Sequence, residues 1–246
     1  MTEYSKPYEI YFCSGNVGKY EHLLLNTQHI ESVKIVQKQN IDIVEPQLNS
    51  IEEIAIYKAK KAFEILKKPV IVQDSGLVIK ELKDFPGPYT KYVSQTIGCT
   101  GILKLLEGKR DRSCGFTACL VFIDEAEQVH VFNEHNKAKY WGEIACPEET
   151  NFLFDECKDT HDNQVSGTKQ LGKLAASWSS SHPNENLWSI FIPLDISFLP
   201  NHRKTLAQLS DEEITRYRKS RKSVFKEFGK WLDKKNLIYS KDSSIV

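Results

Sequence analysis

Residues 69–91 of this chain read P-V-I-V-Q-D-S-G-L-V-I-K-E-L-K-D-F-P-G-P-Y-T-K. The apolar run Val70-Ile71-Val72 predicts a buried strand, and we expect it to end in a carboxylate, a hydroxyl and a flexible glycine at Asp74-Ser75-Gly76. Ligands of open α/β sheets bind beyond the carboxyl ends of strands, so Asp74 is a candidate site residue. The alternative is an ordinary turn, because Asp, Ser and Gly all favour turns for local reasons.

A second glycine-containing segment follows the first expected strand, residues 9–13. The sequence there is Ser14-Gly15-Asn16-Val17-Gly18-Lys19, and a segment rich in leucine comes next. Strand, glycine loop and helix in this order can wrap a phosphate with backbone N–H groups, while the helix N-terminus and Lys19 supply positive charge. The glycine spacing differs from that of a Walker loop. An ordinary strand-to-helix turn is the alternative.

After another expected strand at 33–37, Ser50 and Glu53 form a capping box that predicts a helix start. The helix has an apolar stripe at helical spacing. Lys58 lies seven residues after Ile51 and therefore near that stripe, where its side chain either extends from the rim or points into a cleft. The stripe consists of Ile51, Ile54, Ala55, Ala59, Ala62, Phe63 and Leu66.

The second half of the chain is less regular. The patterns predict a helix at 98–106 and a hairpin of strands 114–123 and 128–133 with a four-residue loop, which 139–144 would extend. Residues 147–186 read as a long irregular insertion, and 187–193 as a short strand. A capping box at Ser210–Glu213 predicts one long helix with a basic face, followed by a frayed tail over 236–246.

Composition narrows the class of protein. The 33 Lys and Arg balance 33 Asp and Glu, so no overall basic field suggests a nucleic acid or anionic membrane partner. No apolar run approaches the ~20 residues of a membrane span, and no signal peptide is recognisable, so we expect a cytoplasmic protein. The 6 scattered cysteines are expected to be free thiols of a reducing compartment, the alternative being a disulfide framework.

In combination, the motifs resemble the inosine triphosphate pyrophosphatases, which hydrolyse non-standard purine nucleoside triphosphates such as inosine and xanthosine triphosphate (ITP and XTP) to monophosphate and pyrophosphate. The resemblance covers most of the chain outside 147–186 and is more specific in the N-terminal half. It rests on Ser14-Gly15-Asn16-x-x-Lys19, Glu45, Glu53-Ile54-Ala55-x-x-Lys58-Ala59, Asp74-Ser75-Gly76-Leu77, Pro86-Gly87-Pro88-Tyr89-x-Lys91, Gly142-x-Ile144 and Lys204-Thr205-x-Ala207.

The resemblance implies an α/β fold: an elongated mixed sheet flanked by helices, with two lobes and a central nucleotide-binding cleft. It implies one domain over 1–235 and a homodimer. Asp74 and Lys19 would be catalytic, with Asp74 orienting or deprotonating the attacking water. Glu45 and Asp74 would hold Mg²⁺, a hard cation that prefers carboxylate, water and phosphate oxygens. The triphosphate would be bound by Ser14, Asn16, Lys19, Lys58, Ser75, Lys91 and Arg221.

Departures from the family pattern concentrate where the base would be read. The family's Gly-aromatic-Asp-Pro segment corresponds to Asn186–Pro193 here, without its Gly and Asp, and Trp188 is left to stack on a purine or to fill the core. The family's Ser-His-Arg becomes Lys219-Ser220-Arg221. Two alternatives follow: a pyrophosphatase with altered base specificity, or a catalytically inactive nucleotide-binding or interaction protein.

Overall fold

The computed structural model describes residues 7–134, 142–143, 210–220 and 222–242. The chain divides into two compact units. The first contains residues 1–75, 117–136 and 218–246, and the second contains residues 76–116 and 137–217. Within the described ranges, no helix is both long enough and apolar enough to cross a membrane.

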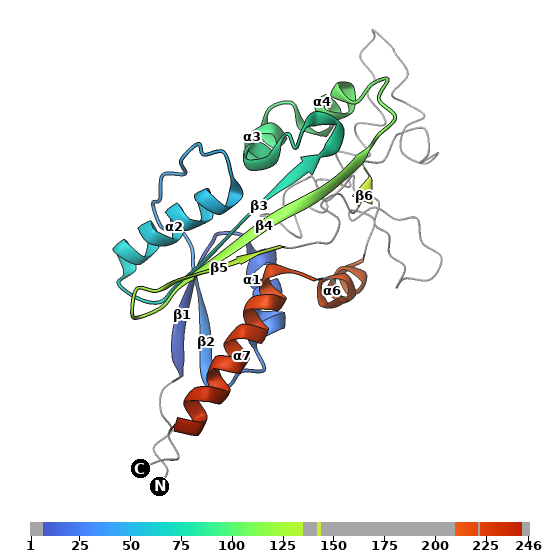
Figure 1. Cartoon of the computed structure of the whole chain (residues 1–246). Coiled ribbons are helices and arrows are strands. Elements are labelled where there is room, and N and C mark those ends of the chain that lie inside the picture. The colour runs from blue at the N-terminus through green and yellow to red at the C-terminus, as the bar shows by residue number, and fades with distance from the viewer. Residues whose placement is uncertain (1–6, 135–141, 144–209, 221, 243–246) are drawn as a thin grey trace. The chain divides into compact units, whose positions relative to one another are not determined.

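Within the described residues, a mixed sheet of six strands forms the centre of the fold (Figure 1). Its order is β2-β1-β3-β4-β5, and β6 pairs with β4. β1 runs parallel to both β2 and β3, whereas β5 and β6 are antiparallel to β4. The strands are β1 (Tyr8–Cys13), β2 (Val33–Lys38), β3 (Val70–Ile79), β4 (Ser113–Ile123), β5 (Val129–Asn133) and β6 (Gly142–Glu143).

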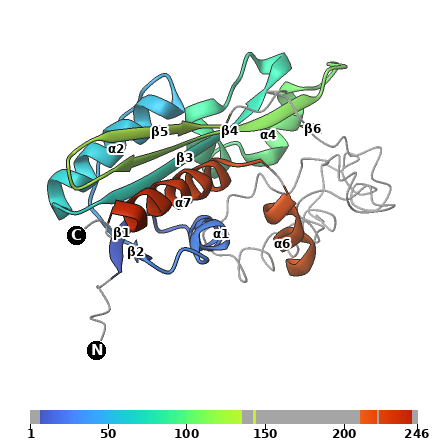
Figure 2. The ribbon, with the colours of Figure 1, turned by 60° about the horizontal axis from the view of Figure 1, so that its bottom comes forward.

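Side chains of alternate residues in the strands point to opposite faces of the sheet, and helices of the first unit cover both faces. On one face lie α1 (Val17–Thr27) and α7 (Val224–Asp242), which contact each other, and on the other lies α2 (Ile51–Leu66) (Figure 2). The expected α/β fold, a mixed sheet flanked by helices, is therefore confirmed.

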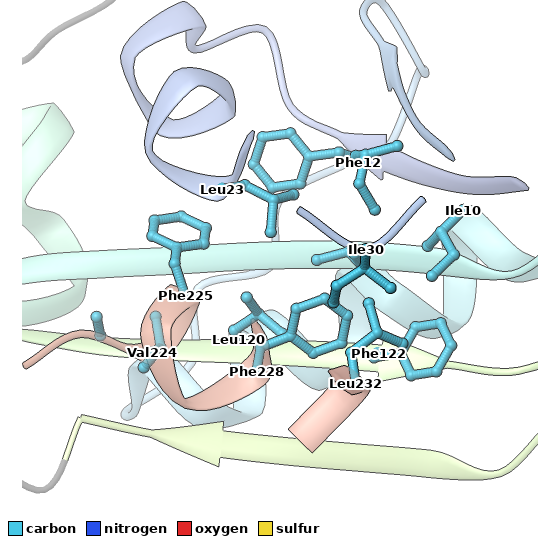
Figure 3. Close-up of a cluster of buried hydrophobic side chains, with 13 residues drawn as sticks. Ile10, Phe12, Leu23, Ile30, Leu120, Phe122, Val224, Phe225, Phe228 and Leu232 are labelled. Atoms are coloured by element: carbon cyan, nitrogen blue, oxygen red, sulfur yellow. The ribbon is translucent and has the colours of Figure 1, made fainter. Parts of the chain in front are cut away.

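The face under α1 and α7 contains the larger core of the first unit. Phe12 and Leu120 project from the sheet toward Leu23 of α1 and toward Phe225 and Phe228 of α7 (Figure 3). Phe12, Leu23 and Phe228 are fully buried, and burying each such side chain contributes on the order of 1.5–3 kcal/mol. This core fixes α1, and with it the loop that precedes α1.

The opposite face packs the small residues of α2 against Val70, Val72 and Val121 of the sheet. The predicted stripe is confirmed: Ile51, Ile54, Ala55, Ala59 and Ala62 are buried, and Phe63 and Leu66 pack beside them. Ser50 begins the helix as expected, since its Oγ accepts a hydrogen bond of 3.1 Å from the Glu53 N–H.

Two expectations about the C-terminal region were wrong. The single long helix is two helices, α6 (Asp211–Ser220) and α7. Ser223 is buried and starts α7 afresh, because its Oγ accepts a hydrogen bond from the Lys226 N–H at 3.3 Å. The frayed tail is also corrected, since α7 continues to Asp242. The capping box of α6 is confirmed by reciprocal hydrogen bonds between Ser210 and Glu213.

In the second unit, β3 leads through the 3₁₀ turns η1 (Lys80–Leu82) and η2 (Gly87–Tyr89) into α3 (Thr90–Gln95) and α4 (Gly98–Leu105). The buried Thr90 holds the motif Pro86–Tyr89 in place, because its hydroxyl donates to the Gly87 carbonyl at 2.6 Å and accepts from the Leu77 N–H at 2.8 Å. The hairpin loop has five residues instead of the expected four, since β5 begins at Val129.

Three of the cysteines, Cys13, Cys114 and Cys119, are free thiols, as predicted. Burial raises the pKa of Cys13 to about 12, and burial, with the carboxylates of Glu52 and Asp74, raises that of Cys119 to about 12. These thiols therefore stay protonated at neutral pH. The expected insertion at 147–186 and the expected strand at 187–193 lie outside the described residues.

Candidate functional site

The loop after β1 is organised around Asn16. The Asn16 side-chain oxygen accepts a hydrogen bond of 2.8 Å from the Lys19 N–H and thereby caps α1. Ser14 supports the loop, since its Oγ accepts from the Asn16 N–H at 3.2 Å and its carbonyl accepts from Gln37 Nε2 at 2.9 Å. The result is a polar loop at the positive end of a helix, an arrangement that suits a phosphate.

Lys19 brings a cation from α1 to strand β3. Its Nζ donates a hydrogen bond of 3.3 Å to the carbonyl of Gln73, the residue before Asp74. Gln73 is buried, and its Nε2 donates to the Asp74 carbonyl at 2.9 Å. Two hydrogen bonds through Gln73 therefore connect Lys19 to the Asp74 backbone, and the two residues lie close together.

Asp74 does not stand at the end of a strand as expected, because β3 continues through it to Ile79. The strand that ends here is β1: it pairs with β3 at Tyr11–Val70 and Phe12–Ile71 and stops at Cys13. Asp74 and Ser75 thus lie past the end of β1, and they are the two residues of β3 that are only partly buried. The rule that ligands bind beyond the ends of strands therefore applies to β1, the strand that ends beside Asp74.

Lys58 of α2 joins two carboxylates that are distant in sequence. Its Nζ lies 2.8 Å from Glu45 Oε2 and 3.1 Å from Asp74 Oδ2. The other oxygen of Asp74, Oδ1, accepts a hydrogen bond of 2.9 Å from the Ser75 N–H. The Lys58 side chain therefore turns toward these carboxylates instead of extending from the rim into solvent.

Burial would by itself lower the pKa of Lys58, but the nearby Asp74 carboxylate and the hydrogen bond and charge of Glu45 outweigh it and raise the pKa. Side-chain exposure is 21% for Lys58 and 15% for Asp74, against 48% for Glu45. Lys58 is therefore a fixed positive charge at neutral pH. The more exposed Glu45 sits where a charged ligand can reach it.

Sequence comparison matches residues 10–163 to the model of the Ham1 family, which spans more than half of the chain. The chain belongs to the Ham1 family. Its resemblance to the inosine triphosphate pyrophosphatases is thereby confirmed, and a Trypanosoma cruzi relative, 37% identical over 119 residues (47% of this chain and 59% of the relative), is named inosine triphosphate pyrophosphatase 1.

Two archaeal relatives of this Ham1 protein carry the name dITP/XTP pyrophosphatase. The Methanopyrus kandleri protein is 44% identical over 118 residues, which is 47% of this chain and 61% of that protein. The Methanothermobacter marburgensis protein is 32% identical over 182 residues, which is 69% of this chain and 95% of that protein. The matched segment therefore spans less than two thirds of the Methanopyrus protein but nearly all of the Methanothermobacter protein.

Solved Ham1 structures share the fold. The Staphylococcus aureus Ham1 protein aligns with a TM-score of 0.58 at 20% identity, over 92% of this chain and 99% of that chain. A Ham1 protein from Coxiella burnetii gives 0.59 at 19% identity, with the same coverage of 92% and 99%. At these identities, the likeness supports the architecture of the sheet and its flanking helices.

In the described part of this Ham1 chain, Glu45 and Asp74 are a pair that could hold a metal ion. One oxygen of each carboxylate lies within hydrogen-bond distance of the same Lys58 nitrogen, so the two carboxylates are close to each other. Among the described residues, no group of three or more His, Cys, Asp or Glu could hold a metal. Two carboxylates fit Mg²⁺, which completes its shell with water and phosphate oxygens.

Of the predicted site residues, the structure brings together Asn16, Lys19, Glu45, Lys58 and Asp74, with Ser14 and Ser75 beside them, all in the first unit. Lys91 is exposed in α3 of the second unit and stays a sequence-based prediction. Arg221 and Trp188 lie outside the described residues. Binding of the purine base by Trp188 therefore also stays a prediction.

Two supporting residues, Gln37 and Gln73, were missed by the sequence analysis. Gln37 holds the Ser14 carbonyl from β2, and Gln73 links Lys19 to Asp74. One signal pointed to Gln73: it is an amide at the end of an otherwise apolar strand, and buried polar side chains are expected to make hydrogen bonds. Gln37 had no such signal, because it contacts the loop across a parallel strand pair.

Proposed function

We propose that this chain hydrolyses a non-standard purine nucleoside triphosphate, such as ITP or XTP, to the monophosphate and pyrophosphate with the help of Mg²⁺. The observation that carries the proposal is the contact of Lys58 with both Glu45 and Asp74, beside the capped loop of Ser14 and Asn16. Two carboxylates and two lysines near the end of β1 support the proposal. The names of the archaeal relatives supply the substrate class.

Each part of the site has a chemical task in this reaction. The α1 N-terminus and Lys19 bind phosphate oxygens by hydrogen bonds and charge. Asp74 orients the attacking water and accepts its proton through a carboxylate whose Oδ1 is fixed by the Ser75 N–H. The water oxygen bonds to the α-phosphorus, and the bond from that phosphorus to the bridging oxygen of the β-phosphate breaks, which releases pyrophosphate.

Bound Mg²⁺ would neutralise charge that builds up on the phosphate oxygens. Lys58 contributes further positive charge from the α2 side of the sheet, where the α2 stripe fixes its position. Catalysis of this kind is mainly positioning and electrostatic stabilisation. A cytoplasmic location and a homodimer complete the proposal, and sedimentation velocity would show a dimer directly.

The test is pyrophosphate release from a panel of nucleoside triphosphates with and without Mg²⁺. We expect turnover that is highest for inosine or xanthosine triphosphate and that falls about 10²–10⁴-fold in Asp74→Asn, because the general base is lost. The Asp124→Asn variant, on the β4–β5 hairpin, is a control that keeps its activity. If the wild type turned over none of the nucleotides, the proposed enzymatic activity would be refuted. Preferential turnover of a standard nucleotide would refute the substrate class.

A further inference from the structure

Lys58 occupies the position between the two carboxylates that a metal ion would need. Its Nζ is 2.8 Å from Glu45 Oε2 and 3.1 Å from Asp74 Oδ2, so one ammonium group forms ion pairs with both carboxylates. The backbone of Lys58 is held in place, because Lys58 follows the buried Ile54 and Ala55 of α2 at helical spacing. Glu45 approaches from the segment between β2 and α2.

An ammonium group and a divalent cation compete for these oxygens. An Mg²⁺ ion held by Glu45 and Asp74 would be repelled by the positive charge of the nearby Lys58 ammonium group. A metal that uses these two oxygens therefore has to displace Lys58 from them. The lysine stem is flexible enough for such a movement, provided that its charge finds another partner.

A triphosphate offers that partner. It carries several anionic oxygens for Lys58, and a metal–triphosphate complex brings the cation for Glu45 and Asp74 at the same time. We propose that Lys58 is an exchangeable counter-ion: it holds the two carboxylates against free metal ions and releases them when metal and triphosphate arrive together. This inference rests on the proposed function and adds an order of binding to it.

Binding of free metal by charge variants tests the exchange directly. Mn²⁺ is titrated into the full-length protein without nucleotide, and the free ion is followed by electron paramagnetic resonance. We expect Lys58→Met to bind Mn²⁺ at least about tenfold more tightly than the wild type, because the competing cation is gone. Lys61→Met is the matched control. It lies on the same helix and loses an ion pair with Glu64, and its Mn²⁺ affinity should equal that of the wild type.

A second arm adds a non-hydrolysable purine triphosphate analogue. Wild-type affinity for Mn²⁺ should then rise, and the advantage of Lys58→Met should disappear, because the lysine now faces phosphate. Equal or weaker Mn²⁺ binding by Lys58→Met without nucleotide overturns the proposal. Lys58→Gln, which keeps a hydrogen-bond donor without the charge, must give the same ranking and serves if Lys58→Met does not fold, as judged by circular dichroism.

Failure of the proposed function has a different signature. If Glu45→Gln and Asp74→Asn leave Mn²⁺ affinity unchanged in the Lys58→Met background, the two carboxylates are not metal ligands, and the site itself is wrongly assigned. If both substitutions weaken Mn²⁺ binding but Lys58→Met does not strengthen it, only the counter-ion role is refuted.

Discussion

Asn16 combines a structural task and a proposed binding task in one side chain. Its Oδ1 caps α1, and the same loop is expected to receive a phosphate. The two tasks differ in how they respond to charge. Asp is as good an N-cap residue as Asn, and the helix dipole favours its negative charge. A bound phosphate, in contrast, is repelled by that charge.

Replacement of Asn16 by Asp should therefore separate the two tasks. We expect Asn16→Asp to keep the wild-type free energy of unfolding and to bind a triphosphate analogue more weakly, as measured by urea unfolding and calorimetry. Asn16→Ala should lose about 1 kcal/mol of stability through the lost cap, in addition to affinity. Unchanged affinity in Asn16→Asp would show that the side chain serves only the helix.

At the scale of elements, α1 is held by its contact with α7. Gly229 of α7 faces the carbonyl of Asn26 in α1, and a Cβ atom built on Gly229 would clash with that backbone oxygen. The aromatic cluster around Phe228 and Trp231 packs beside it. The glycine thus permits the close approach that positions the loop of Asn16.

Gly229→Ala should destabilise the protein by about 1–3 kcal/mol, because backbone cannot move aside as a side chain can. Urea unfolding measures the loss. Gly15→Ala is the control for stability, since a Cβ there meets no atom within 4 Å. A Gly229→Ala variant as stable as the wild type would show that the two helices can separate without cost.

The turn of the β4–β5 hairpin gives a prediction for pH. Burial would raise the pKa of Asp124, but hydrogen bonds from His130 at 2.8 Å and from the Gln128 and Ala126 N–H groups lower it below the ordinary 3.8. A lowered pKa stabilises the fold at pH values above 3.8, and this contribution is lost as the pH falls through the lowered value.

Asp124→Asn keeps the acceptor oxygen of the turn and removes the charge. We expect it to cost up to about 1 kcal/mol at pH 5, since the pair is partly exposed, and the difference from wild type should shrink toward pH 3. Urea unfolding across this range measures it. A difference that stays constant with pH would mean that the charge of Asp124 does not contribute.

At the scale of the whole molecule, most residues of the proposed site belong to the first unit. Residues 14–19, Glu45, Lys58 and Asp74 belong to the first unit, whereas Lys91 belongs to the second. Hydrogen exchange of backbone amides can report on both units in one experiment, because ligand binding suppresses local opening where contacts form.

Addition of Mg²⁺ and a triphosphate analogue should slow exchange in peptides that cover 14–19 and 45–58, as measured by mass spectrometry. Peptides around Lys91 should also slow if that lysine binds phosphate as the resemblance implies. The β4–β5 hairpin around 124–130 is the internal control and should not change. Unaltered exchange at 14–19 would contradict the phosphate loop.

Sequence alone determined the local features of this protein. The capping boxes at Ser50 and Ser210, the α2 stripe and most strand positions follow from periodicity and end signals, which depend on neighbouring residues only. The motifs also gave the family and the candidate residues, five of which meet in one site.

Tertiary structure decided what depends on contacts between distant segments. The end of β1, not of β3, opens the site at Asp74, because strand pairing sets which backbone is left uncovered. Buried Ser223 splits the expected C-terminal helix, since a cap outweighs a continuous helical pattern. Lys58 could be read as a surface lysine until folding placed Glu45 and Asp74 around its ammonium group, because only a fold brings together charges 13 and 16 residues away along the chain.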